Sequence, residues 1–386
     1  MRLDDNSMHD RNDEEEPRIR VAFIASREST YSRVAILKQS LESTFDVTFF
    51  LSEKKNYPTR ILSVYLQFLF ALLLGHLKNV DVLVVGFFAQ PMLPMLRFFW
   101  RRPIISDGYF SIFDTLVHDK AKVRSHSIIG KLCYWLDRYM LQNSDLVLTD
   151  TLEHVEFFKQ SFNVPHAQVE RLWVSAQDTV FRYQSPLPLQ KEEKCEVLFW
   201  GGFIPLQGVE VIIQAAHLLR DNAVHFTIVG SGQTFPSCKR LSQELNTDNV
   251  SFIGWQTLEG LQELASKSHI ILGIFGTTNK AKRVIPNKAF QAIALAKPLI
   301  TGDSPASREL FSNGYNAMLV PLGDPEALAE RIKWAKDDYE KTLTIAQRGY
   351  STFLEKASPA RIQDLLSGYI QQVTRPSSST ATRRTT

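Results

Sequence analysis

The chain is poor in cysteine and has no leader-like start. Cys133, Cys195 and Cys238 are its three cysteines, and they form neither a CxxC pair nor an even-numbered framework. This pattern gives no support to a thiolate metal site and is typical of a reducing cytoplasm. The acidic residues 1–17 contain no apolar core, so we expect a disordered tail there and not a signal peptide. We expect a second disordered tail over residues 374–386.

The chain also lacks a strong charge of either sign. Its formal net charge of +3 over 386 residues is too small to indicate a nucleic-acid partner. Its apolar content of 44% and charged content of 22% are those of a globular protein. The length exceeds that of one ordinary core, so the composition predicts two domains.

No apolar run is long enough to span a bilayer. The longest, ILSVYLQFLFALLLG at residues 61–75, falls short of the ~20 residues that a spanning helix needs. A buried core helix is one interpretation, and a helix lying on a membrane surface is the other. We prefer the buried core helix. Phe98, Phe99 and Trp100, followed by Arg101 and Arg102, give some support to the alternative, because aromatic and cationic side chains suit a membrane interface.

Carboxylates are absent from residues 264–302. This stretch predicts a strand end, a basic loop, a helix that begins at Pro286, and a second strand. A helix N-terminus with Lys280, Lys282, Arg283 and Lys288 around it suits a phosphate group. The alternative is a solvated basic loop in front of an ordinary buried helix.

Apolar strands alternate with helices along the whole chain, which predicts parallel sheets covered on both faces. In the first half we expect strands at 20–26, 47–51, 80–86, 103–106 and 146–149, and helices at 32–43, 61–77 and 128–143. In the second half we expect strands at 197–200, 225–229, 250–253, 270–274, 298–301 and 318–320. The expected helices there are 209–219, 238–245, 258–266, 286–296, 306–311 and 325–336.

A shift to proline, glutamine and charge over residues 183–194 marks the domain boundary. We therefore predict an α/β protein with two Rossmann-like, doubly wound domains, over residues 18–183 and 184–344. A final helix over 345–373 has no strand of its own to cover, and we expect it to return to the first domain.

Glycine turns follow two strands of the second domain. Gly201 and Gly202 end the strand VLFW, and Gly230 and Gly232 end the strand HFTIV. Such turns let a backbone approach a phosphate or a sugar, although strand-to-helix turns also use glycine for geometry alone. Neither turn contains GxGxxG, which argues against nicotinamide and flavin cofactors.

The second half resembles the donor domain of GT-B-fold glycosyltransferases, in particular the large retaining family 4. The similar segments are GGFIPLQGVEVIIQAAHLL, HFTIVGSGQ, NVSFIGW, IPNKAFQAIALAKPLITGDSPASREL and NGYNAMLVPLGDPEALA, which follow one another over residues 196–335. The first half is similar through LDRYMLQNSDLVLTDT and DGYFSIFDTLVHD. The resemblance implies a nucleotide-diphosphate sugar bound in a cleft between the two domains.

The resemblance and the basic loop together give a set of donor-binding residues. They are Gly201, Gly202, Phe203, Gln207, Gly230, Gly232, Trp255, Lys280, Pro286, Asn287, Lys288 and Gln291. Trp255 stands where the family holds the nucleobase, although a large aromatic also suits a core.

Two departures from the family concern charge. The two diphosphate-binding cations of the family's glycine turn are replaced by Gly202 and Gln207, and its Glu-x7-Glu pair by Arg283 and Gln291. Gln291 could still accept from ribose hydroxyls through its amide oxygen. We expect Lys282 and Arg283 to supply the missing counter-charge for the diphosphate.

Polar residues after the strand PIIS suit an acceptor sugar. The acceptor-binding candidates are Asp107, Ser111, Thr115 and Asp119, with Asp114 and His118 as catalytic candidates beside Lys282 and Arg283. His118 could assist proton movement, and Asp114 could instead cap a helix.

The implied activity is retaining transfer in which the leaving diphosphate takes the acceptor's proton. It requires no cofactor besides the nucleotide sugar, and no metal, in keeping with the absence of an Asp-x-Asp motif. The expected acceptor is a glycan or a lipid-linked sugar, met in the cytoplasm or at the inner membrane face. The alternatives are a nucleotide-sugar epimerase and an inactive partner subunit.

Overall fold

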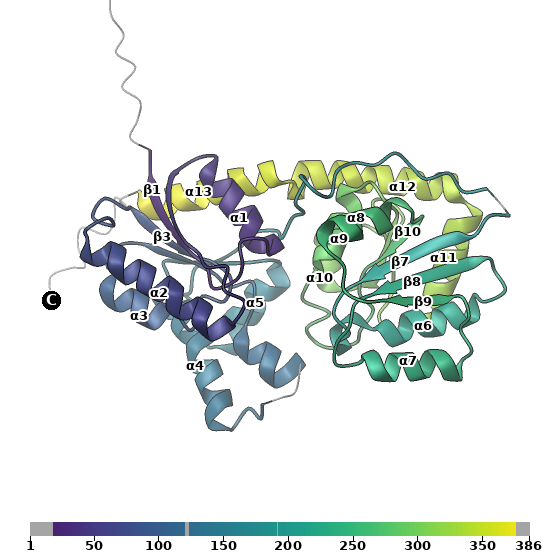
Figure 1. Cartoon of the computed structure of the whole chain (residues 1–386), viewed down its shortest axis with the longest axis horizontal. Coiled ribbons are helices and arrows are strands. Elements are labelled where there is room, and N and C mark those ends of the chain that lie inside the picture. The colour runs from purple at the N-terminus through teal and green to yellow at the C-terminus, as the bar shows by residue number, and fades with distance from the viewer. Residues whose placement is uncertain (1–17, 120–122, 191, 376–386) are drawn as a thin grey trace, which may run out of the picture.

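The protein consists of two α/β domains, each built on a six-stranded parallel sheet (Figure 1). The computed structural model describes residues 18–119, 123–190 and 192–375. The strand orders are β2-β1-β3-β4-β5-β6 and β12-β11-β10-β7-β8-β9. The predicted fold class is therefore confirmed. Both predicted tails lie outside the described residues, apart from Thr374, which ends the last helix, and Arg375.

The first domain alternates strands with helices from its first strand to its last. Its strands are β1 (Arg20–Ile24), β2 (Asp46–Phe50), β3 (Val82–Val85), β4 (Ile104–Asp107), β5 (Leu146–Thr149) and β6 (Val169–Arg171). Its helices are α1 (Ser32–Glu42), α2 (Tyr57–Leu73), α3 (Leu93–Phe99), the π-helix η1 (Asp114–Asp119), α4 (Ile128–Asn143) and α5 (Leu152–Ser161).

The second domain repeats the pattern. Its strands are β7 (Cys195–Trp200), β8 (Val224–Val229), β9 (Val250–Ile253), β10 (Ile270–Leu272), β11 (Leu299–Asp303) and β12 (Met318–Pro321). Its helices are η2 (Pro205–Gln207), α6 (Val209–Leu218), α7 (Phe235–Glu244), α8 (Leu258–Ser266), α9 (Asn287–Ala294), α10 (Pro305–Arg308) and α11 (Pro325–Asp337). The chain then continues as α12 (Tyr339–Thr352), η3 (Phe353–Ala357) and α13 (Pro359–Thr374).

The terminal helix joins the two domains. Figure 1 shows α12 and α13 running along one side of the molecule, with α13 beside α1 of the first domain. Gln363 donates to the Thr44 hydroxyl at 3.0 Å, and the Tyr369 hydroxyl donates to the Arg171 carbonyl at 3.0 Å. The single helix predicted over 345–373 is instead broken at Ser358, where Pro359 begins a new helix capped by the Ser358 side chain.

Sequence periodicity missed three elements of the first domain and misjudged a fourth. Strand β6 and helices α3 and α5 were not predicted, because each is short or weakly patterned. Helix α2 is not a buried core helix: Val64 and Phe68 are buried, whereas Leu66 and Phe70 are exposed. No helix within the described residues combines the length and the apolar character needed to cross a bilayer.

A carboxylate of the second domain caps a helix of the first. The Glu309 side chain accepts from the backbone N–H groups of Leu152 and Glu153 at 2.8 and 3.0 Å, and from the Arg171 guanidinium at 3.1 Å. These N–H groups belong to the first turn of α5, where the helix dipole also favours an anion.

We expect Glu309→Ala to lower the free energy of unfolding by about 1–3 kcal/mol, because it leaves the first N–H groups of α5 without this acceptor. Urea unfolding followed by circular dichroism measures this change. Glu326→Ala, in the first turn of α11, is the control and should change stability by less than about 0.5 kcal/mol. Equal effects of the two substitutions would refute a capping role for Glu309.

Candidate functional site

The glycine turns of the second domain meet at the carboxyl ends of neighbouring strands β7 and β8. A Cβ on Gly230, whose φ is 132°, would lie 2.0 Å from the Gly201 carbonyl oxygen. Glycine is therefore required at 230 by the packing of one turn against the other. A Cβ on Gly202, by contrast, would meet no atom within 4 Å. Gly202 is thus the point at which a ligand could approach this backbone.

The Lys288 ammonium group lies beside the same turn. It projects from the first turn of α9, and its Nζ donates to the Gln207 side-chain oxygen and, at 3.4 Å, to the Gly273 carbonyl. Nζ also lies 3.6 Å from the centre of the Phe199 ring. Lys288 is only 4% exposed, and this burial lowers its pKa well below the ordinary value of 10.5. A Cβ on Gly201 would lie 3.0 Å from Nζ, so a buried amine stands beside Gly201, the residue that precedes the open Gly202.

The contact between Lys288 and Gln207 bears on how this site could bind a diphosphate. Gln207 occupies one of the two positions at which the similar family has a diphosphate-binding cation, and the Lys288 amine contacts the Gln207 oxygen. A cation therefore reaches the glycine turn from α9 and not from the turn itself. Pro286 is the N-cap of α9 and not its first helical residue, and no side chain caps this N-terminus.

Gln291, on the same helix, makes a buried hydrogen bond in this structure, and its role at the ribose stays a prediction. Its amide oxygen accepts from the Trp200 indole N–H at 3.1 Å, and both side chains are buried. The oxygen expected to receive ribose hydroxyls therefore fixes α9 against the end of β7. Sequence spacing could not reveal this contact, because the two residues lie 91 positions apart.

The basic loop before α9 reaches the first domain. Arg283 donates to the Asp114 carboxylate at 2.7 Å, and the Lys280 ammonium donates to the Thr115 hydroxyl at 2.6 Å. The loop has no carboxylate of its own, but the facing domain supplies one. The Arg283 guanidinium is therefore paired with Asp114 in this structure, and its role at a diphosphate stays a prediction. Lys282 is exposed.

Two further hydrogen bonds connect the same segments. The Tyr109 hydroxyl donates to the Asn287 side-chain oxygen at 3.0 Å, and the Thr151 hydroxyl donates to the Arg283 carbonyl at 2.5 Å. Tyr109 follows β4 and Thr151 follows β5, so both come from carboxyl ends of the first sheet. The start of α9 is thus fixed from both domains.

Two of the four acceptor candidates make contacts inside the first domain. Asp107 is buried and forms an ion pair with the equally buried Arg33 at 3.0 Å. Ser111 is buried and donates to Asp137 at 2.8 Å. Both residues are buried in this structure and support the end of β4, and their role at an acceptor sugar stays a prediction. The side chains of His118 and Asp119 lie outside the described residues.

Asp137 organises the loop that leads to Asp114. Besides Ser111, it accepts from the backbone N–H groups of Ile112 and Phe113 at 3.2 and 2.8 Å. Burial raises the pKa of Asp137 to about 7, although these hydrogen bonds act in the opposite direction. Asp137 lies in the segment LDRYMLQNSDLVLTDT, but the sequence did not predict a role for its carboxylate, because its partners lie 24 or more positions away.

The two aromatic donor candidates differ in exposure. Phe203 is buried against Phe235 and Phe252, so only its backbone lies at the glycine turn. Trp255 is 63% exposed after β9, and therefore it is not a core residue. Its side chain is available to a planar ligand at the same edge of the sheet.

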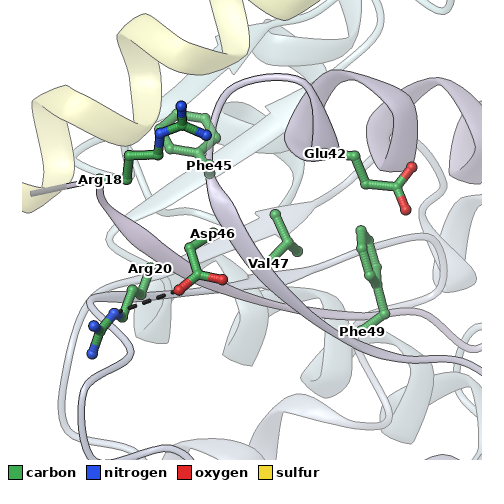
Figure 2. Close-up of a pocket in the computed structure, with 7 residues that line it drawn as sticks. All are labelled: Arg18, Arg20, Glu42, Phe45, Asp46, Val47 and Phe49. Atoms are coloured by element: carbon green, nitrogen blue, oxygen red, sulfur yellow. Dashed lines mark ion pairs between the residues drawn. The ribbon is translucent and has the colours of Figure 1, made fainter.

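A separate pocket at the edge of the first sheet is not part of this site. Figure 2 shows its lining, in which Arg20 pairs with Asp46 at 3.5 Å. These two residues begin β1 and β2, whereas the glycine turns and the β4 and β5 loops follow the carboxyl ends of their strands. The pocket therefore opens at the opposite end of the first sheet from the interdomain contacts.

Comparison with known proteins finds a family similar to the second domain. Residues 194–338 match the family model of glycosyl transferases group 1. An uncharacterized glycosyltransferase of Methanocaldococcus jannaschii, MJ1178, is 22% identical over 159 residues, which are 39% of this chain and 41% of that protein. The lipopolysaccharide core biosynthesis glycosyltransferase LpsD of Rhizobium meliloti is 24% identical over 169 residues, 44% of this chain and 47% of that protein. The matches thus span less than half of these relatives.

Solved structures extend the likeness to both domains. Anabaena HepE in complex with UDP and glucose has a TM-score of 0.67 at 14% identity, over 92% of this chain and 100% of that chain. Sucrose-phosphate synthase of Thermosynechococcus elongatus has a TM-score of 0.70 at 16% identity, over 92% of this chain and 99% of that chain. This likeness shows the fold, which is GT-B.

Proposed function

We propose that this GT-B-fold chain, whose second domain matches the group 1 glycosyltransferases, moves a hexose from a nucleotide-diphosphate sugar to a glycan or lipid-linked sugar with retention of configuration. The similarity to a lipopolysaccharide core transferase supports a role in polysaccharide synthesis. The UDP and glucose bound to Anabaena HepE support a nucleotide-sugar donor. We also infer that the protein works in the cytoplasm, peripherally at the inner face of the membrane.

The observation that carries the proposal is the position of Lys288. A buried ammonium group, held by the Gln207 oxygen beside a glycine turn with open space at Gly202, is suited to an anionic ligand. The N-terminus of α9 adds backbone N–H groups and a partial positive charge to the same place. A diphosphate satisfies all three features at once.

The same groups would assist the reaction. The bond between the anomeric carbon and the diphosphate oxygen breaks, and the acceptor oxygen bonds to the same face of the sugar. The leaving diphosphate takes the acceptor's proton, so no protein carboxylate is needed as a base. Negative charge builds up on the diphosphate as its bond breaks, and the Lys288 cation would stabilise that charge. In this proposal the reaction needs no metal ion.

Arg283 and Lys280 would act differently from Lys288. Because both reach across to η1, they would hold the acceptor-side loop against the donor domain. Thr115 and Asp114 would therefore be positioning residues in this proposal. Trp255 would cover the base of the nucleotide from the solvent side.

The test is turnover of a panel of nucleotide sugars with glycan and lipid-linked acceptors. We expect one donor to be consumed only when an acceptor is present, with the anomeric configuration kept by proton NMR and the rate unchanged by EDTA. Conversion of the donor sugar without any acceptor would instead identify an epimerase. Absence of both turnover and nucleotide binding would leave an inactive partner subunit.

A further inference from the structure

Three helices of the first domain carry large apolar side chains that the described chain leaves exposed. They are Leu62, Leu66, Phe70, Leu73 and Leu74 at α2, Phe98 and Phe99 on α3, and Ile128, Ile129, Leu132 and Trp135 on α4. We call this set the apolar face. Leu73, Phe98 and Ile128 are 83%, 71% and 87% exposed. Exposed apolar clusters of this kind mark interaction sites in folded proteins.

Helix α2 is apolar on two opposite sides. Arg60, Val64, Phe68 and Ala71 form its buried stripe. Leu62, Leu66, Phe70 and Leu73 repeat the same spacing two positions later and form the exposed stripe. Two residues correspond to about 200° around a helix, so the second stripe points away from the sheet. The sheet therefore accounts for only one of the two stripes.

The three helices lie on the same side of the sheet. Buried residues of α2, α3 and α4 share one core cluster with Ile24, Val85 and Val147, whereas α1 packs on the other sheet face. The Tyr65 hydroxyl of α2 donates to the carbonyl of Pro91, just before α3, at 2.9 Å. Figure 1 shows α2, α3 and α4 gathered on the side away from α1 and α13. The apolar face is therefore carried by helices that cover the same side of the sheet.

The segments that carry this surface contain no carboxylate apart from the buried Asp137. Residues 54–80, 82–106 and 124–136 hold nine lysine and arginine residues and neither aspartate nor glutamate. Arg60 and Arg97 pair with Glu28 and Asp145 of other segments. Arg101 and Lys131 are exposed and form no ion pair within the described residues. These segments therefore supply cations and no exposed carboxylate.

We propose that the apolar face, with the cations of the same segments, docks the first domain onto the surface of an anionic phospholipid bilayer. Leucine, isoleucine, phenylalanine and tryptophan side chains would enter the boundary between headgroups and acyl chains, and the cations would meet lipid phosphates. Trp100, which the sequence offered as an interfacial aromatic, is buried and takes no part. A second copy of the chain fits poorly, because like charges would then face each other.

This surface belongs to the acceptor-side domain, so docking would bring that domain to lipid-linked sugars. The inference deepens the peripheral membrane location in the proposed function and rests on that part of it, but it does not depend on the transferase activity. Vesicle binding requires neither donor nor turnover, so failure of either proposal can be recognised separately.

The test is flotation of the full chain with phosphatidylcholine vesicles that contain or lack phosphatidylglycerol. We expect binding to anionic vesicles that is at least ten times stronger than to neutral ones and that weakens with salt. Leu66→Glu/Phe70→Glu should lose at least tenfold in vesicle affinity. Leu218→Glu/Leu354→Glu is the matched control, because these leucines are exposed outside the apolar face, and it should bind like the wild type.

Thermal unfolding of both double variants checks that they are folded. Equal flotation of Leu66→Glu/Phe70→Glu and wild type, or no flotation of the wild type with any vesicle, would overturn the proposal. A wild-type dimer in light scattering that Leu66→Glu/Phe70→Glu disperses, without any effect on flotation, would assign the surface to a second copy.

Discussion

Lys288→Met is expected to weaken the binding of a nucleoside diphosphate at least about a hundredfold, which corresponds to about 2.7 kcal/mol. The substitution removes the one buried cation that contacts Gln207 at the glycine turn and leaves a side chain of similar length. A charge-assisted hydrogen bond in a site shielded from water contributes more than one at the surface. Isothermal titration with uridine and guanosine diphosphates measures the loss.

The same substitution should leave the empty protein almost as stable as before, within about 1 kcal/mol. Lys288 is desolvated and has no carboxylate partner in the described chain, so its charge opposes folding. Loss of binding without loss of stability is the signature of a residue kept for a ligand. A structural lysine would show the reverse.

Lys297 provides the matched control. It is also buried, but it follows the C-terminal end of α9, and its ammonium group donates to the carbonyls of Ser266 and Ser268. We expect Lys297→Met to lower stability by about 1–3 kcal/mol and to leave nucleotide affinity within threefold of the wild type. Equal losses of affinity in the two variants would contradict a specific role for Lys288.

Arg283→Met is expected to destabilise the protein by about 3 kcal/mol, because it leaves the Asp114 carboxylate buried without its counter-charge. Asp114 is 1% exposed, and its ion pair with Arg283 connects the two domains. We expect Asp114→Asn to cost a similar amount for the opposite reason. Urea unfolding measures both.

The double variant Arg283→Met/Asp114→Asn distinguishes the interaction energy of the ion pair from the effects of losing each residue alone. We expect it to be at least about 1 kcal/mol more stable than the sum of the single effects allows, because neither charge is then left alone. Nucleotide affinity of Arg283→Met should fall less than about threefold, since Asp114 already holds the guanidinium. Strict additivity would mean that the contact does not connect the domains. A hundredfold loss of nucleotide affinity in Arg283→Met would instead show that Arg283 binds the diphosphate.

Local sequence patterns predicted several strands and helices of the fold correctly. Strand β5 and helices α4 and α8 have the predicted bounds, because apolar runs and clear caps such as Ser127 and Thr257 define them. Helix α2 was misjudged because leucine and phenylalanine occupy both of its faces, so its periodicity is hidden. The missed strand β6 has only three residues, too few for a pattern.

The site was predictable where one segment determines it and unpredictable where two domains meet. The glycine turns and Lys288 were named as candidates from single stretches of sequence, and the structure brings them together. Asp114 and Arg283 lie 169 positions apart, and nothing near either residue indicates the other. The burial of Asp107 with Arg33 likewise depends on how α1 packs against the end of β4. Partners of this kind follow from tertiary structure alone.

Proton uptake on nucleotide binding tests whether Lys288 lies at the bound diphosphate, which affinity alone does not show. Burial lowers the pKa of Lys288 in the empty protein, and a bound diphosphate would raise it again. Between these two pKa values the bound state holds a proton that the empty state lacks. Nucleotide binding should therefore take up a proton in that window, and affinity should fall as the pH rises through it.

Calorimetric titration of whichever nucleoside diphosphate binds, in two buffers of different ionisation enthalpy, measures this uptake directly. We predict up to one proton taken up per nucleotide by the wild type and by Lys297→Met, together with affinity that decreases towards alkaline pH. Residual binding to Lys288→Met at high ligand concentration should take up none. Tight binding by the wild type with no proton exchange at any pH up to 10.5, and with the same affinity in Lys288→Met, would contradict a diphosphate site built around this buried lysine.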